Sequence, residues 1–185
     1  MNERVKQIRT DALVAEYIYS NRLHWIGMFS TILNILTIIV PILFSSVLLL
    51  GKGTSYEGVL NIISVLTSAV LLSLVILGLI LRVEQKKEAY IIGRRSNIYV
   101  SNEALKLIEE SDDKLVWFYN YLVEMDSKDQ ENIGKASDGI RKKAYRYSLK
   151  KLFPGRNDVV CSICNSSPFL YKKGSCQICG NTPKE

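Results

Sequence analysis

Apolar residues dominate two long stretches of this sequence, 25–50 and 58–81, and a short polar segment separates them. The first stretch lies in a run without Asp, Glu, Lys or Arg from Leu23 to Gly51. The second has none of these residues from Gly58 to Leu81. An α-helix needs about 20 apolar residues to cross a bilayer whose hydrocarbon core is about 30 Å thick. The pattern therefore predicts two transmembrane helices, 25–50 and 58–81.

The connecting segment, Gly51–Glu57, is too short to return across a membrane. We therefore expect the two spans to be antiparallel neighbours in a transmembrane hairpin. The alternative is a pair of buried helices in the core of a soluble protein. A chain of 185 residues is too short to wrap two such helices in other protein, and this disfavours the alternative.

Residues on both sides of the hairpin alternate between apolar and charged positions at helical spacing. Val5, Ile8 and Ala12 predict an N-terminal helix, 1–24, that runs into the first span. The segment 82–155 predicts cytosolic helices. The first of them extends from Arg82 to about Glu110, and its apolar face is predicted to be Ile92, Tyr99, Leu105 and Ile108.

The segment Lys114–Met125 is dense in apolar and aromatic residues, above all in Trp117–Val123. Only a buried helix, or one at a subunit interface, is expected to carry so many of them. Ser127–Gln130 has the pattern of a capping box and predicts the start of a last helix. That helix is expected to bury Ile133, Ala136, Ile140, Ala144, Tyr147 and Leu152, and to stop at Pro154.

Small and polar residues recur along one face of the first span, with a shorter series in the second. Two interpretations stand: these residues pack helices against each other, or they line a water-filled path in an oligomer. Asn34 is the strongest pore candidate, because its amide is the group least suited to lipid. The candidate residues are Ser30, Asn34, Thr37, Pro41, Ser45, Asn61, Ser64 and Ser68.

Positive charge predicts the orientation of the hairpin. The formal net charge is +6, and basic residues precede the first span and follow the second. The connecting segment holds only Lys52. Cytoplasmic flanks of membrane helices carry the excess of Lys and Arg. We therefore expect a multi-pass membrane protein with its N-terminus and C-terminus in the cytoplasm.

The four cysteines form the spacing C-x₂-C-x₁₁-C-x₂-C: Cys161, Cys164, Cys176 and Cys179. Two CxxC pairs place four thiolates within reach of one tetrahedral metal ion. The reducing cytoplasm argues against two disulfides. Residues 156–185 therefore predict a zinc-ribbon-like tail with a structural zinc; iron is the less favoured alternative. Residues 168–172 are expected to form a strand.

The last predicted helix ends in a basic run. This run is expected either to stay solvated, to contact anionic lipid headgroups, or to bind nucleic acid, which is the least favoured of the three. Its residues are Arg141, Lys142, Lys143, Arg146, Lys150 and Lys151. The sequence contains neither a nucleotide-binding loop nor a Ser/His/Asp set, and its one histidine is isolated. We therefore expect no enzymatic activity.

A short N-terminal helix, a membrane hairpin and a helical region ending in KKAYRYSLKKLFPG resemble the SLATT family over residues 1–155. The C-x₂-C-x₁₁-C-x₂-C tail resembles a group of proteins carried on mobile elements and characterised by that spacing. The SLATT resemblance implies a defence effector that oligomerises and opens the membrane. It also implies a separate sensor or signalling protein as partner.

The predicted fold class is mainly α: a two-helix transmembrane hairpin with cytosolic helices and a C-terminal tail with four cysteines. The predicted function is a membrane effector of a bacterial defence or mobile-element conflict system that forms homo-oligomers in the lipid bilayer and permeabilises the inner membrane. The alternative is a membrane-anchored adaptor whose zinc ribbon recruits a protein or nucleic acid.

Overall fold

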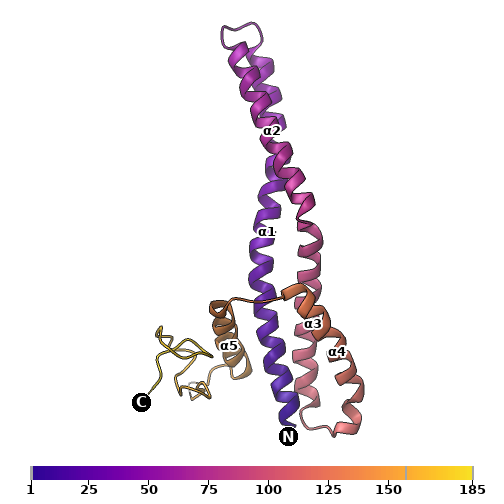
Figure 1. Cartoon of the computed structure of the whole chain (residues 1–185), viewed down its shortest axis with the longest axis vertical. Coiled ribbons are helices and arrows are strands. Elements are labelled where there is room, and N and C mark those ends of the chain that lie inside the picture. The colour runs from indigo at the N-terminus through magenta and orange to yellow at the C-terminus, as the bar shows by residue number, and fades with distance from the viewer. Residues whose placement is uncertain (1, 157, 185) are drawn as a thin grey trace. The chain divides into compact units, whose positions relative to one another are not determined.

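The computed structural model describes residues 2–156 and 158–184, and this part of the chain is mainly helical (Figure 1). In chain order the elements are α1 (Glu3–Gly51), α2 (Glu57–Ile80), α3 (Val83–Leu107), the 3₁₀ helix η1 (Asp112–Leu115), α4 (Val116–Ile133) and α5 (Asp138–Leu152). No β-strand occurs within the described residues. The predicted fold class, mainly α with two apolar helices and a four-cysteine tail, is confirmed.

The chain divides into two compact units. One, the hairpin unit, is His24–Glu88; the other, the helical unit, combines Met1–Leu23 with Ala89–Glu185. The regions predicted from the sequence, 1–155 and 156–185, follow other boundaries and stay a prediction. They include Met1, Asn157 and Glu185, which lie outside the described residues.

In the hairpin unit, the second half of α1 and the whole of α2 are long and apolar enough to cross a membrane. Their most apolar windows have mean hydropathies of 2.5 and 2.6, and 0% and 6% of those windows are buried inside the protein. A helix in the core of a soluble protein would be covered by other protein. These exposures therefore argue against the alternative of two buried core helices.

Close contacts between α1 and α2 occur near both ends of the hairpin. At the turn, the side chain of Leu60 lies so close to Gly51 that a Cβ there would be 2.4 Å from it. Near the other end, a Cβ on Gly78 would lie 3.1 Å from Leu33. The connecting turn is closed by Glu57, whose Oε2 accepts a hydrogen bond of 2.9 Å from the Gly53 N–H.

The sequence predicts helical structure from Arg82 onwards, but the structure interrupts the helix at this residue. Arg82 has a φ of 50°, in the left-handed region that residues with a Cβ rarely adopt, and α3 begins only at Val83. α2 and α3 are therefore separate helices, divided at the first charge after the apolar stretch.

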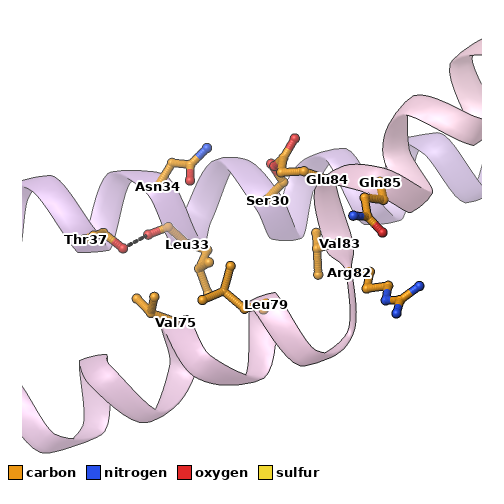
Figure 2. A pocket seen from close by; sticks show the side chains of 11 residues that line it. Ser30, Leu33, Asn34, Thr37, Val75, Leu79, Arg82, Val83, Glu84 and Gln85 are labelled. Carbon is orange, nitrogen blue, oxygen red and sulfur yellow. Dashed lines mark hydrogen bonds between the residues drawn. The ribbon is translucent and has the colours of Figure 1, made fainter.

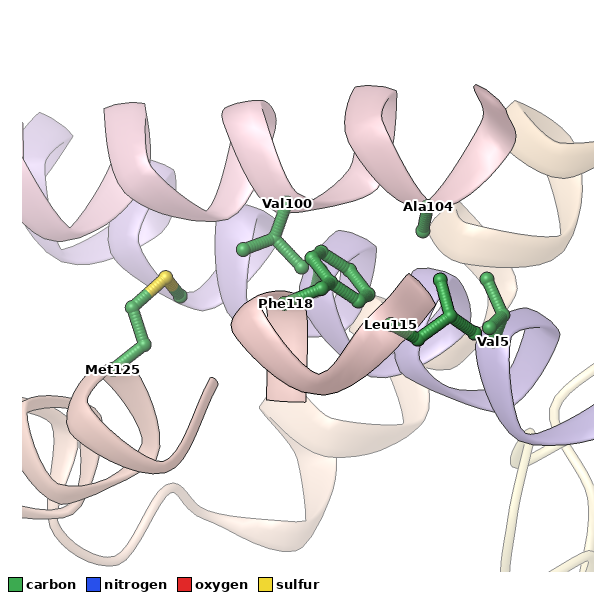
Figure 3. Packing of buried hydrophobic residues seen from close by; sticks show 7 residues of the cluster. Val5, Val100, Ala104, Leu115, Phe118 and Met125 are labelled. Atoms are coloured by element: carbon green, nitrogen blue, oxygen red, sulfur yellow. The ribbon is translucent and has the colours of Figure 1, made fainter. Parts of the chain in front are cut away.

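The helical unit has a hydrophobic core built from α1, α3, η1 and α4. Figure 3 shows the side chain of Phe118 between those of Val100 and Leu115, with Val5 and Ala104 close by. Phe118, Leu115 and Val5 are fully buried. A second cluster joins Ile18 of α1 to residues near α5. It contains Ala136 and Ala144, with Ile133 and Ile140 packed against them. The sequence predicts all four on one last helix, but Ile133 lies in α4 and Ala136 precedes α5.

The predicted apolar face of α3 is wrong for three of its four residues; the fourth, Ile108, packs against the core just after the helix. Ile92, Tyr99 and Leu105 are 47–55% exposed, whereas Asn97, Val100, Ser101 and Ala104 are buried. The buried face of this helix therefore contains small and polar residues. The reason is close helix packing: a Cβ on Gly93 would lie 2.3 Å from the ring of Tyr19 in α1.

The predicted capping box at Ser127–Gln130 is also wrong, because these residues lie inside α4. That helix ends at Gly134, which has a φ of 53°, and α5 begins after Ser137. The carboxylate of Asp129 is occupied by a tertiary contact. Its Oδ1 accepts a hydrogen bond of 2.6 Å from the Tyr19 hydroxyl, and its Oδ2 accepts one of 2.9 Å from the Asn97 amide.

This Tyr19–Asp129–Asn97 network joins α1, α3 and α4. Tyr19 is fully buried and Asn97 is 2% exposed, so both need a polar partner inside the protein. Burial raises the pKa of Asp129, which the hydrogen bonds from Tyr19 and Asn97 partly offset. Burial and the contact with Asp129 also raise the pKa of Tyr19.

We expect Asp129→Ala to destabilise the helical unit by about 1–3 kcal/mol, because the buried Tyr19 hydroxyl loses its acceptor. The Asn97 amide keeps its 3.0 Å bond to the Gly93 carbonyl. Hydrogen exchange of the α3 amides measures the change. Asp126→Ala is the matched control, because Asp126 is an exposed aspartate on the same helix; its effect should stay within about 0.5 kcal/mol. Equal effects of the two variants would contradict a structural role for the network.

Candidate metal centre

The four cysteines converge on one point in the tail. Their sulfur atoms all lie within 4.8 Å of one another, and each side chain is at most 5% exposed. The cysteines are free thiols, and the Sγ atoms of Cys164 and Cys179 are 3.4 Å apart, well beyond a disulfide bond of about 2.05 Å. Four sulfurs at about 2.3 Å from one zinc ion lie about 3.8 Å apart, which agrees with this cluster.

The two CxxC segments have the same backbone geometry. In the first, the Asn165 N–H donates to the Cys161 carbonyl at 2.9 Å, and in the second the Gly180 N–H donates to the Cys176 carbonyl at 2.9 Å. Asn165 and Gly180 each follow the second cysteine and have φ values of 53° and 73°. Each turn therefore needs a left-handed residue, and Gly and Asn adopt that conformation most readily.

The segments are joined by side-chain hydrogen bonds and by single backbone bonds, such as the 3.0 Å bond from the Lys184 N–H to the Cys164 carbonyl, and not by a sheet. The predicted strand at 168–172 is wrong, because in the described part of the tail the only pairing is an isolated bridge between Lys173 and Asn181. The buried Asn181 amide donates to the Ser167 carbonyl at 2.9 Å and accepts from the Lys172 N–H at 2.6 Å. Gly174 must approach the Thr182 backbone, where a Cβ would be 2.3 Å away.

Ionisation of the cysteines is set by burial and by backbone hydrogen bonds. Burial works against ionisation of Cys176, but hydrogen bonds from the backbone of Cys179 and Ile178 outweigh it and lower the pKa of this thiol to about 6. Burial raises the pKa of the Cys179 thiol, and the neighbouring cysteine sulfurs add to this shift. The cluster therefore favours one thiolate near neutral pH, which is the form that a metal ion binds.

The donor set fits a metal ion such as zinc. Four buried sulfurs fill a tetrahedral coordination shell and leave no open position for a substrate, so the site is of the structural kind. Iron also binds to four thiolates, so these ligands by themselves do not distinguish zinc from iron.

A family model agrees with this arrangement: that of the mobilome CxxCx(11)CxxC proteins matches residues 2–182. The chain belongs to this family. No curated protein and no solved structure matches the chain. The match covers the apolar helices as well as the cysteine tail, and together they fit a membrane role linked to mobile elements.

In this mobilome CxxCx(11)CxxC protein the tail contacts α5 through the basic run. The Arg146 guanidinium donates to the Cys179 carbonyl and lies 3.9 Å from the centre of the Tyr171 ring. One turn further along, the Lys150 ammonium lies 5.6 Å from the Phe169 ring. One turn earlier, a Cβ on Gly180 would lie 3.2 Å from the side chain of Lys142.

The structure therefore divides the six basic residues. Lys142 and Arg146 are half-buried against the cysteine tail, and Lys150 is exposed although its ammonium lies near Phe169. Arg141, Lys143 and Lys151 are exposed and make no contact with the tail that the structure shows. Of these last three, Lys151 lies 5.6 Å from the Tyr147 ring. Contact with anionic lipid or nucleic acid stays a prediction, and these three side chains are the ones available for it.

The polar series of the two spans is placed mostly outside the contact between α1 and α2. Ser30 is buried and Ser64 is half-buried. The other six candidates are exposed: Asn34, Thr37, Pro41, Ser45, Asn61 and Ser68. Packing within one hairpin therefore accounts for two of the eight residues. For the six exposed residues two predictions remain: they pack against neighbouring hairpins, or they line a water-filled path.

Three residues of this series share a cavity of about 370 Å³ in the hairpin unit. Figure 2 shows Ser30, Asn34 and Thr37 along α1, opposite Val75 and Leu79 of α2. At one end the Ser30 hydroxyl donates to the Glu84 carboxylate, and the Lys87 ammonium donates to Ser30 at 3.2 Å. Polar and charged groups therefore continue from the predicted span to its flank.

Sequence reasoning missed several residues that hold the site together. Asn181 makes hydrogen bonds within the tail, and Arg146 of α5 donates a hydrogen bond to it. Asn97 and Asp129 join α3 to α4. A usable signal was present for Asn181, because it follows Gly180 directly after the last cysteine. For Asn97 the sequence offers no signal, and the capping-box pattern around Asp129 indicates a different role from the one that the structure shows.

Proposed function

We propose that this chain is a membrane effector of a bacterial defence or mobile-element conflict system, which forms homo-oligomers and permeabilises the inner membrane. The observation that carries the proposal is the exposure of Asn34, Thr37 and Ser45 on a helix that is long and apolar enough to span a membrane. An amide at that depth in a bilayer requires protein or water around it. In an oligomer, neighbouring hairpins or a shared aqueous path meet that requirement.

The proposal includes both termini in the cytoplasm, a separate sensor or signalling protein, and no catalytic activity of the chain itself. Its support is the excess of basic residues on both flanks of the hairpin, the reduced cysteines, and the resemblance to the SLATT family. The metal-binding tail is then the part through which a partner controls the hairpins.

The orientation predicts the labelling of single cysteines by an impermeant thiol reagent. In intact cells, Ser55→Cys in the turn of the hairpin is expected to react, whereas Ser127→Cys on α4 is expected to react only after permeabilisation. Both positions are exposed. The unsubstituted chain is the control for its four buried cysteines. Labelling of Ser127→Cys alone in intact cells would invert the orientation.

The conducting path predicts that Asn34→Leu abolishes depolarisation and leaves the oligomer intact. Induced cells with a membrane-potential dye measure the first, and native electrophoresis of detergent extracts measures the second. If Asn34 only supports helix packing, the amount of oligomer falls instead. Ser46→Leu is the matched control, because Ser46 is exposed on the same helix outside the polar series, where its hydroxyl donates to the Ile42 carbonyl.

An unchanged membrane potential and unchanged growth on high expression of the intact chain, with its natural trigger present, would contradict the effector function. The outcome would also favour a second function, a membrane-anchored adaptor. One observation supports that alternative: Ile163 and Leu170 in the cysteine tail are 67% and 78% exposed, a surface suited to another protein. For an adaptor, loss of the tail abolishes partner capture and Asn34→Leu has no effect.

A further inference from the structure

A second cavity, of about 660 Å³, lies in the helical unit. It is lined by the first turns of α1, by the end of α5 and by Ile178, which lies between the last two cysteines. Binding sites for small organic molecules usually have volumes of about 300–1,000 Å³ and mainly apolar walls with a few polar groups. The size of this cavity is within that range.

One side of the cavity is apolar and aromatic. Tyr145, Leu149 and Leu152 contribute from α5, followed by Phe153. Ile178 adds an apolar side chain from the second CxxC segment, and it is 42% exposed. Such a wall is suited to an aromatic or branched hydrocarbon group, because burying that group removes apolar surface from water on both partners.

The opposite side carries an arginine whose hydrogen bonding is incomplete. Arg9 lines the cavity, and its Nε is buried. In the described part of the chain it is the one buried side-chain nitrogen or oxygen without a hydrogen-bond partner. A buried donor on a charged group is costly when it has no acceptor. Burial also lowers the pKa of Arg9, because it removes water from around the cation.

A carboxylate of the protein limits the charge that this site accepts. Asp11 lines the same cavity, and the Gln7 amide donates to both of its oxygens at 2.9 and 3.1 Å. Burial raises the pKa of Asp11. A second anion next to Asp11 is repelled, and a doubly charged phosphate is repelled more strongly than a monoanion. Lys6, the other cation of the lining, is already paired with Glu3 at 2.7 Å. Arg9 and Asp11 together therefore favour a ligand with a single negative charge.

We propose that this cavity binds a small organic monocarboxylate. Its carboxylate accepts hydrogen bonds from the Arg9 guanidinium, and its apolar body packs against Tyr145, Leu149 and Phe153. The site is independent of the proposed pore. Because Ile178 is part of the second CxxC segment, a ligand here contacts the metal-binding tail directly.

The test uses the full-length, zinc-loaded protein in detergent and 4-phenylbutyrate as the probe, followed by isothermal titration calorimetry with empty micelles as blank. The uncharged 4-phenylbutyramide has the same apolar body. The carboxylate is expected to bind about tenfold or more tightly than the amide, which corresponds to one charge-assisted hydrogen bond. Equal binding of the two, or no binding of either, overturns the proposal.

Two variants and a third probe complete the test. Arg9→Gln is expected to remove the preference for the carboxylate, whereas Lys135→Gln, which removes an exposed charge outside the cavity, retains it. Ile178→Trp fills the cavity and is expected to abolish binding with the zinc content unchanged; it decides the question if Arg9→Gln does not fold. Tighter binding of 4-phenylbutyl phosphate than of the carboxylate refutes the monoanion assignment, and retained binding by Ile178→Trp refutes the location.

Discussion

The purified protein is expected to contain about one zinc ion per chain, and the Cys164→Ser, Cys179→Ser double variant is expected to contain none. In the variant, residues 158–184 are expected to become accessible to protease. Residues 158–184 form no strand and have little core besides the four cysteines, so metal ligation is expected to supply most of the folding free energy of the tail. Structural zinc sites contribute about 10–16 kcal/mol of apparent binding free energy at neutral pH. Elemental analysis and limited proteolysis measure the two effects.

A variant of the docking contact separates folding of the tail from its attachment. Arg146→Gln removes the guanidinium that donates to Cys179 and lies over Tyr171. It is expected to keep the zinc and to raise hydrogen exchange along α5, whereas Arg141→Gln, on the exposed side of the same helix, leaves both unchanged. Two disulfides and no metal in the unsubstituted protein would refute the metal site and the cytoplasmic location of the tail.

Phe118→Ala is expected to lower the free energy of unfolding of the helical unit by about 3–5 kcal/mol, the usual cost of emptying a buried aromatic site. Phe118 is fully buried among residues of α1, α3, η1 and α4. Val123→Ala on the same helix is the control. Val123 is 71% exposed, so its effect should stay within about 0.5 kcal/mol. Hydrogen exchange of the α3 and α4 amides measures both.

The difference in burial between Phe118 and Val123 also determines which residues are suitable for testing self-association. The sequence predicts that the Trp117–Val123 cluster is buried or lies at a subunit interface, and the structure divides it. Phe118 belongs to the core, whereas Trp117 and Val123 are 48% and 71% exposed. A loss of oligomer in Phe118→Asp would reflect unfolding. Similar stability of Phe118→Ala and Val123→Ala would contradict the packing in Figure 3.

The two apolar helices and the cysteine site were determined by the sequence alone. An uncharged run of more than about 20 residues has few alternatives to a helix in lipid, because no water is present there to satisfy an irregular backbone. The four cysteines were equally informative. The C-x₂-C-x₁₁-C-x₂-C spacing forms the sulfur cluster through two local turns, so little else in the fold was needed to predict it.

Only the tertiary structure decided which surfaces of the soluble helices are buried. Large apolar residues suggested one face for α3, and close packing of Gly93 on Tyr19 selected another, with Asn97 and Ala104 inside. The segment around Asp129 shows the same effect. Its local pattern predicts the start of a helix, but in the structure Asp129 lies inside α4 and accepts hydrogen bonds from Tyr19 and Asn97. Arg146 resembles its neighbours in sequence and differs because Tyr171 and Cys179 lie against it. Such contacts join residues that are far apart in the chain, so they cannot be predicted from the pattern of residues within one segment.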